Sequence, residues 1–199
     1  MCIRDSFKPS AWRVSMTGVL PLSANLDSIG PIAASVRCCA ELDAILSGDG
    51  GPVPEALPLR GLRLAVPTTL ALDAMEKHVA DTFAATVARL KEAGALVDEI
   101  AIPEFAELGN INSKGGFTAA EAWAWHRDLI ARAGKRYDPR VVSRIMRGQD
   151  MSAADYLDLL DAREAWVAAV DRRIAGYDAL IMPTTPIVAP AVADLAASD

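Results

Sequence analysis

Residues 8–31 read KPSAWRVSMTGVLPLSANLDSIGP, a run rich in Gly, Pro and Ser. These residues change the direction of the backbone, and the run follows neither a helical nor an alternating period. We therefore expect an ordered loop with brief extended pieces. A helical pattern begins directly behind it, at Ile32. A long apolar loop that feeds a helix is typical of segments that line a site on a rigid scaffold, and a buried connector has the same pattern.

The first half of the chain predicts a helix followed by a strand–helix–strand unit. Apolar residues at helical spacing favour a helix over residues 32–47, ended by Gly48. A strand is expected at Leu62–Val66 and a second at Leu96–Ile102. Between them, Asp73 and Glu76 have the spacing of a capping box at the start of a helix. This order favours two parallel strands joined by a crossover helix.

The second half predicts mostly helix. Thr118 with Glu121 and Ser152 with Asp155 again have capping-box spacing, before helices that run to about Ala133 and Ala175. Pro139 favours the start of a short helix through Arg147. The apolar run Ala179–Met182 has the length of a strand buried on both faces, as in a sheet that helices cover. The expected fold class is therefore α/β.

Composition excludes several classes of function. The net charge is −6 with acids and bases interspersed, whereas a nucleic-acid surface needs clustered Lys and Arg. No apolar run is long enough to span a bilayer, and the start lacks a signal-peptide core, so we expect a cytoplasmic protein without a membrane partner. The three cysteines form neither a disulfide framework nor a metal-ligand pattern, and we expect no metal and no cofactor.

The quoted motif resembles the central segment of the amidase signature family. Members of that family read KPT-x-GRVS, then an SLD-x-IGP loop and an SV-x-D helix, where this chain has KPSAWRVS, NLDSIGP and SVRC. The resemblance runs from about Phe7 to Pro190 and includes YDALIMPTTPIVAP at residues 177–190. It implies part of an amidase-signature fold, in which helices cover both faces of a mixed β-sheet. Residues 7–199 are then a partial, C-terminal portion, and residues 1–6 a non-native leader.

The resemblance also implies a chemistry and its location. Amidase-signature enzymes hydrolyse a carboxamide to a carboxylate and ammonia through an acyl-serine intermediate. Their serine nucleophile, second serine and lysine base all precede the KPT motif, and no Gly/Ser-rich run of that kind occurs here. We therefore assign no catalytic residue to this chain and expect it to be inactive alone. The alternatives are the glutamine-hydrolysing component of an amidotransferase (its A subunit), which serves tRNA-linked transamidation, and a non-catalytic scaffold or binding domain.

The pocket walls are what these residues would contribute to a small amide substrate. In the family, the loop that matches Leu26, Asp27, Ser28 and Ile29 lies against the catalytic core. The loop that matches Thr184 and Thr185 borders the substrate channel. Small and hydroxyl residues near strand ends suit a crevice at the carboxyl ends of parallel strands. The alternative for Asp27 is that it braces its own loop through backbone N–H groups.

The chain departs from the family pattern at two positions. Trp12 stands where the family has a glycine, which suggests either a close approach of the backbone or a positive φ, and a Trp there is expected to strain the packing unless the local register differs. Cys38 stands where the family usually has Asp. Strands without their neighbours leave unpaired edges and uncovered apolar faces, so we expect aggregation or a homodimer.

Overall fold

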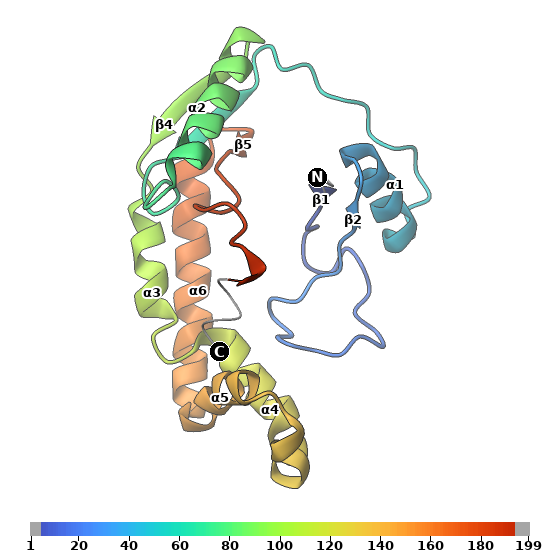
Figure 1. Cartoon of the computed structure of the whole chain (residues 1–199), viewed down its shortest axis with the longest axis vertical. Coiled ribbons are helices and arrows are strands. Elements are labelled where there is room, and N and C mark those ends of the chain that lie inside the picture. The colour runs from blue at the N-terminus through green and yellow to red at the C-terminus, as the bar shows by residue number, and fades with distance from the viewer. Residues whose placement is uncertain (1–4, 194–199) are drawn as a thin grey trace. The chain divides into compact units, whose positions relative to one another are not determined.

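The computed structural model describes residues 5–193, which form two compact units (Figure 1). The first unit comprises Met1–Ala56 and Ile111–Leu160, and the second comprises Leu57–Asn110 and Asp161–Asp199. The long helix α6 (Ala153–Ile174) contributes its beginning to the first unit and its end to the second. Both units combine helices with short strands, which confirms the α/β class.

The first unit begins with a small antiparallel pairing and one helix. Strand β1 (Asp5–Ser6) pairs with β2 (Ile32–Ala33), and helix α1 (Val36–Ser47) follows. The expected helix start at Ile32 is wrong, because Ile32 and Ala33 are extended and pair with β1. Ser35 is the N-cap instead, and its side chain accepts a hydrogen bond from the N–H of Cys38. The helix ends as expected at Gly48, whose φ is +74°.

Residues 7–31 form the expected loop without a regular helix or strand. Its two ends meet where the N–H of Phe7 donates to the carbonyl of Pro31 at 3.0 Å. This closure needs glycine at position 30, since a Cβ there would lie 2.0 Å from the carbonyl oxygen of Phe7. Trp12 has a φ of +72°, so of the two expected reasons for a glycine at this position the structure shows the positive φ.

The rest of the first unit is helical. It contains α4 (Gly116–Ala133), α5 (Pro139–Met146) and the first turns of α6, with 3-10 turns η2 (Gly134–Arg136) and η3 (Arg147–Asp150) between them. Its apolar core contains Phe117, Ala119, Ala122, Ile145 and Leu159. The helices pack closely at Gly148, where a Cβ would lie 2.0 Å from the carbonyl oxygen of Ala119.

Two of the helix starts in this unit follow the sequence signals and one does not. Asp138 accepts from the N–H of Arg140 at 2.8 Å, just before Pro139. Ser152 and Asp155 form the expected capping box, in which each side chain accepts from the other residue's N–H. The capping box expected from Thr118 and Glu121 is wrong, because the N-cap of α4 is Gly115, three residues before Thr118, and the Glu121 carboxylate binds elsewhere.

The second unit is built on a three-stranded parallel sheet in the order β4–β3–β5. Strand β3 (Arg63–Pro67) lies between β4 (Leu96–Ile100) and β5 (Ala179–Leu180), with Arg63 opposite Leu96. The parallel strand–helix–strand unit is thus confirmed. The central strand is buried, whereas β5 is a short edge strand and the expectation that Ala179–Met182 is buried on both faces is wrong.

A helix and shorter helical segments accompany this sheet in the second unit. Helix α2 (Lys77–Glu92) packs on β4, and its apolar side chains are half-buried, namely Val79, Phe83, Val87 and Leu90. The expected capping box at Asp73 is wrong: the N-cap is Glu76, which makes no side-chain capping bond and whose N–H donates to the carbonyl of Pro186. The 3-10 turn η1 (Pro103–Glu107) and helix α3 (Leu108–Ile111) follow β4. Trp166 and Arg173 of α6 both bind Glu104 of η1.

Helix length and hydropathy also bear on membrane insertion. Among residues 5–193, none of the helices combines the length and the apolar character that crossing a bilayer requires.

The left-handed backbone at Trp12 predicts a stabilising substitution. Trp12 is 82% exposed, so Trp12→Gly removes little packing while it relieves the steric cost of a positive φ. We expect the free energy of unfolding to rise by about 0.5–1 kcal/mol, measured by urea denaturation followed by circular dichroism. Leu20→Gly is the matched control in the same exposed loop, because its φ is not positive and glycine there only adds freedom to the unfolded chain. Equal destabilisation by both substitutions would contradict the strain at Trp12.

Candidate functional site

The Glu121 carboxylate holds the loop that contains the predicted Leu26–Ile29 site. Ser23 Oγ donates to Glu121 Oε2 at 2.5 Å, and the Asn25 N–H donates to the same oxygen at 3.2 Å. Glu121 Oε1 accepts from the Tyr156 hydroxyl at 2.6 Å and from Asn25 Nδ2. Four donors from the loop and α6 thus converge on one carboxylate of α4, and Ser23 is only 1% exposed.

These contacts set the charge state of the network. Partial burial alone raises the pKa of Glu121, but the hydrogen bonds from Ser23, Tyr156 and Asn25 outweigh it and leave the pKa below that of an ordinary glutamate. Burial, followed by hydrogen bonding to the Glu121 carboxylate, raises the pKa of Tyr156 to about 12. Near neutral pH the network therefore consists of an ionised carboxylate and a neutral phenol that donates to it.

The sequence places Glu121 and Tyr156 there through helical spacing. Glu121 follows Phe117 by one turn of α4, and Phe117 contacts the edge of the Tyr156 ring at a centroid distance of 5.8 Å. Sequence reasoning missed this network because it assigned Glu121 to a capping box with Thr118. A carboxylate on the same helix face as Phe117 was the available signal, since a carboxylate among apolar side chains needs donors.

The four predicted residues of the loop have different surroundings. Asp27 Oδ2 accepts from the N–H groups of Leu22 at 2.9 Å and Ser23 at 3.0 Å, so Asp27 does brace its own loop. Leu26 is 46% exposed, and Ser28 and Ile29 are half-buried. Lining of a substrate pocket by Leu26, Asp27, Ser28 and Ile29 stays a prediction.

The other predicted residues, Thr184 and Thr185, lie in the second unit. They form a crevice with α2 of about 280 Å³, which Pro183, His78, Val79, Thr82, Phe83 and Thr86 also line. Thr185 Oγ1 donates to the carbonyl of Ile187 at 2.9 Å and so holds its own turn. Within residues 5–193, the Thr184 hydroxyl makes no hydrogen bond to the protein. Of the two threonines, Thr184 is therefore the one whose hydroxyl is available to a ligand.

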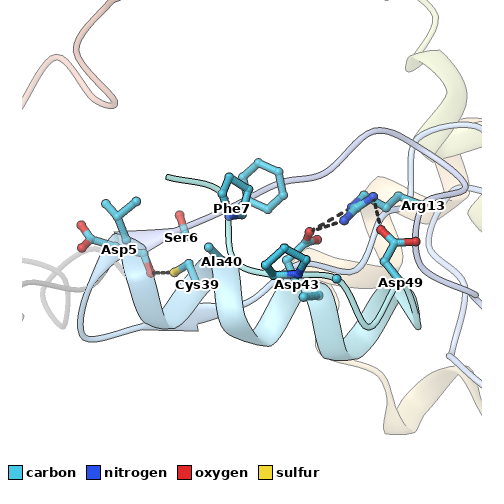
Figure 2. Close-up of a pocket in the computed structure, with 13 residues that line it drawn as sticks. Asp5, Ser6, Phe7, Arg13, Cys39, Ala40, Asp43 and Asp49 are labelled. Carbon is cyan, nitrogen blue, oxygen red and sulfur yellow. Dashed lines mark hydrogen bonds and ion pairs between the residues drawn. The ribbon is translucent and has the colours of Figure 1, made fainter. Parts of the chain in front are cut away.

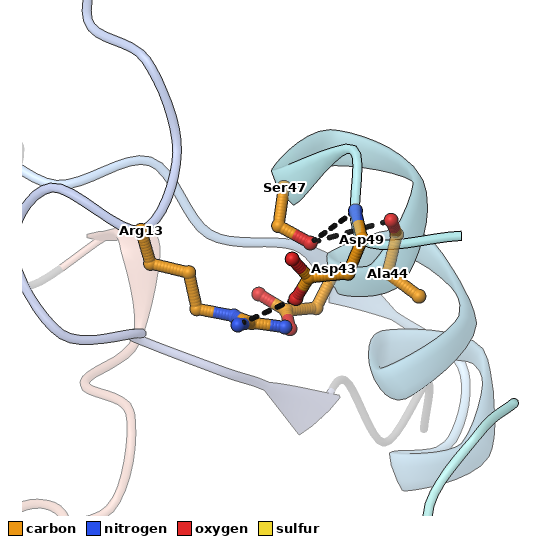
Figure 3. A network of polar contacts seen from close by, with 5 residues as sticks. All are labelled: Arg13, Asp43, Ala44, Ser47 and Asp49. Atoms are coloured by element: carbon orange, nitrogen blue, oxygen red, sulfur yellow. Dashed lines mark hydrogen bonds and ion pairs between the residues drawn. The ribbon is translucent and has the colours of Figure 1, made fainter. Parts of the chain in front are cut away.

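Arg13 of the KPSAWRVS motif forms a second polar cluster in the first unit. Its guanidinium lies between two carboxylates, 2.8 Å from Asp43 Oδ2 and 2.7 Å from Asp49 Oδ2 (Figure 3). The hydrogen bond to Asp43, more than the partial desolvation that opposes it, raises the pKa of Arg13. Ser47 accepts from the N–H of Asp49 and donates to the carbonyl of Ala44, which anchors the chain after α1.

This cluster borders an apolar groove of about 490 Å³, here called the α1 groove (Figure 2). Its lining residues come from β1, from the loop at residues 7–31, from α1 and from the loop that follows α1. They are Asp5, Ser6, Phe7, Arg13, Val36, Cys39, Ala40, Asp43, Ala44, Asp49, Gly51, Pro52 and Pro54. Asp43 is 6% exposed, and among residues 5–193 its Oδ1 has no hydrogen-bond partner.

Neither cluster has the chemistry of an amide hydrolase by itself. Such an enzyme needs a nucleophile next to a base and donors for an oxyanion. Within residues 5–193, no serine hydroxyl is hydrogen-bonded to a lysine or a histidine; Lys77 and Lys114 pair with aspartates and Lys8 with a backbone carbonyl. The same part of the chain brings together no group of His, Cys, Asp and Glu suited to a metal ion.

The Glu121 network predicts a defined dependence of stability on pH. Because the folded-state pKa of Glu121 is lowered, its contribution is present above the ordinary glutamate pKa and is lost as pH falls through the folded value. We expect Glu121→Gln to lower the free energy of unfolding at pH 7 by about 1–2 kcal/mol, a figure reduced for partial exposure. The difference from the wild type shrinks as the pH falls below about 4.

Urea denaturation at a series of pH values measures this effect. Asp128→Asn is the control, because Asp128 is an exposed carboxylate on the same helix and its loss changes the free energy of unfolding by less than about 0.5 kcal/mol. A Glu121→Gln profile that superimposes on the wild-type profile would refute the role given to the carboxylate.

Comparisons with known proteins agree with this fold and these motifs. Residues 6–198 match the family described as Amidase. The chain is 30% identical over 190 residues to the 2-amino-5-chloromuconic acid deaminase of Comamonas testosteroni, covering 94% of this chain and 41% of that protein. It is 30% identical to an amidase of Pseudomonas putida, covering 95% of this chain and 43% of the relative.

Other matches extend the same relationship. The glutamyl-tRNA(Gln) amidotransferase of Symbiobacterium thermophilum has an A subunit that is 29% identical, with 92% of this chain and 44% of the relative covered. A solved structure of an amidase superimposes with a TM-score of 0.82 at 28% identity, over 94% of this chain and 42% of the other. The chain thus spans less than half the length of the relatives it matches. By the family match over residues 6–198, the chain belongs to the amidase family.

Proposed function

We propose that this chain forms part of an amidase that hydrolyses a carboxamide to a carboxylate and ammonia through an acyl-serine intermediate. The observation that carries the proposal is the superposition of 94% of the chain on a solved amidase, at a TM-score of 0.82. Because the chain covers only 42% of that amidase, more than half of such a fold is left to supply the reacting groups. The nucleophile, its base and the oxyanion donors come from that remainder.

In this proposal, the residues of the chain bind and orient the amide. The Thr184 hydroxyl, which has no protein partner among residues 5–193, donates to or accepts from the polar end of the substrate. Val79 and Phe83 of α2 offer an apolar wall in the same crevice. Separately, in the first unit, the loop at Leu26–Ile29 is held in shape by Asp27 and by Glu121, and we propose it as a further substrate-contacting surface. Positioning of this kind lowers the entropic part of a reaction barrier.

A chimera tests the catalytic proposal. The chain replaces the matched portion of the Pseudomonas putida amidase, and ammonia release is measured over a panel of aliphatic and aromatic carboxamides. We expect turnover by the chimera and none by the isolated chain, since the described residues hold no activated nucleophile. Turnover by the isolated chain would contradict the proposal, and so would a folded chimera that releases no ammonia from any amide.

Substitution of Thr184 tests the substrate contact in the same chimera. Thr184→Val keeps the volume but removes the hydroxyl, and we expect kcat/KM to fall about tenfold, as the loss of one substrate hydrogen bond implies. Thr118→Val is the control, because Thr118 is an exposed threonine on α4 outside the crevice, and it leaves kcat/KM unchanged within about twofold. Equal values for Thr184→Val and the unsubstituted chimera would remove Thr184 from the pocket.

The second candidate is the glutamine-hydrolysing component of an amidotransferase. The 29% identity to a protein of that kind favours it. The substrate distinguishes the two candidates: the amidotransferase component releases ammonia from free glutamine, whereas the amidase acts on simple carboxamides. Including glutamine in the panel therefore decides between them.

A further inference from the structure

The α1 groove is an apolar surface that the described residues leave open. Val36 lines it and is 73% exposed. Phe7 also lines it and is 44% exposed (Figure 2). Exposed apolar side chains that cluster around a groove mark an interaction surface more often than a chance patch does. The groove therefore has the composition of a contact surface.

An unpaired atom in the same groove indicates what the contact supplies. Asp43 is more than nine-tenths buried, and its Oδ2 is bound by both Nε and Nη2 of Arg13. Its Oδ1 is buried as well but accepts no hydrogen bond within residues 5–193. A buried carboxylate oxygen without a donor is costly, and native proteins rarely leave one unpaired. The occupant of the groove therefore brings an N–H or O–H donor along with apolar side chains.

Charge argues against a second copy of this chain as the occupant. Three carboxylates, of Asp5, Asp43 and Asp49, line the groove against the single guanidinium of Arg13. In a two-fold symmetric dimer the same patch meets itself, so the groove of one copy would meet the equally acidic groove of the other. Such like-charge contact is unfavourable.

We propose that the α1 groove is the docking surface for a segment of the amidase fold that lies outside these 199 residues, and that this segment donates a hydrogen bond to Asp43 Oδ1. The proposal rests on the proposed function. Partial coverage of the fold supports it, because the chain covers 42% of the solved amidase on which it superimposes with a TM-score of 0.82. The uncovered remainder of that fold must pack against the covered part through apolar contacts. The apolar lining of the α1 groove and its unpaired carboxylate oxygen match a segment that carries apolar side chains and a hydrogen-bond donor.

Two matched variants on α1 separate docking from general effects. Val36 and Ile45 are both 73% exposed, and their separation of nine positions puts them on opposite faces of the helix. Only Val36 lines the groove, so Val36→Asp adds a charge to the docking surface and Ile45→Asp adds one away from it. Ala40→Phe fills the groove without adding charge. Circular dichroism confirms that each variant keeps the helix content of the wild type.

The experiment pairs the full chain with the unmatched portion of the Pseudomonas putida amidase. The two are co-expressed, co-purification is scored, and the dissociation constant is measured by titration of the purified parts. We expect a complex with the wild type, at least tenfold weaker binding for Val36→Asp and Ala40→Phe, and a change within twofold for Ile45→Asp. The absence of a complex, or equal weakening by all three variants, would overturn the proposal.

Light scattering and an ammonia assay on the same samples complete the test. A homodimer of the chain alone that Val36→Asp dissociates and Ile45→Asp does not would assign the groove to a second copy and overturn the proposal. Because complex formation is measured without an activity assay, the docking surface and the proposed amidase function can be refuted independently of each other. A groove-dependent complex that releases no ammonia refutes the proposed function alone, and an active complex indifferent to Val36→Asp refutes the docking surface alone.

Discussion

The first unit depends on the solvation of one carboxylate. Glu121 gives up part of its water when α4 packs, and a carboxylate in that position is stable only if other donors replace the water. Ser23, Asn25 and Tyr156 do so from two other segments of the chain. The loop at residues 22–27 is therefore held by hydrogen bonds to a carboxylate 98 residues further along the chain than Ser23.

Asp43 is a buried carboxylate of the first unit, but only one of its oxygens is hydrogen-bonded within residues 5–193. Its Oδ2 is paired with Arg13, and its Oδ1 is buried without a partner in the described part of the chain, whereas both oxygens of Glu121 are bound. The difference separates the closed interior of the first unit from the open α1 groove. The chain spans less than half of its relatives, and the proposed docking surface accounts for both the exposed apolar side chains and the unpaired oxygen of this groove.

Signals that act within one turn of backbone were predicted well, and signals that compete with tertiary contacts were not. The caps at Asp138 and Ser152 and the left-handed Gly48 were confirmed, because each bond joins residues close in sequence. The helix starts expected at Ile32 and Thr118 were wrong. Pairing with β1 draws Ile32 into a strand, and the Glu121 carboxylate binds Ser23 rather than its own N-cap.

The sequence by itself determined the family, the α/β class and the parallel strand–helix–strand unit, and it singled out Trp12 as a departure from the family. These follow from motif order, hydrophobic period and backbone sterics, all of which are local properties. Only the tertiary structure decided that Glu121 joins Asp27 in holding the loop. It also decided that, within residues 5–193, the hydroxyl of Thr184 has no protein partner whereas that of Thr185 does, and that one oxygen of Asp43 is unpaired. Each of these depends on which polar atoms meet across segments distant in sequence, and hydrogen-bond satisfaction is settled only when the segments are in place.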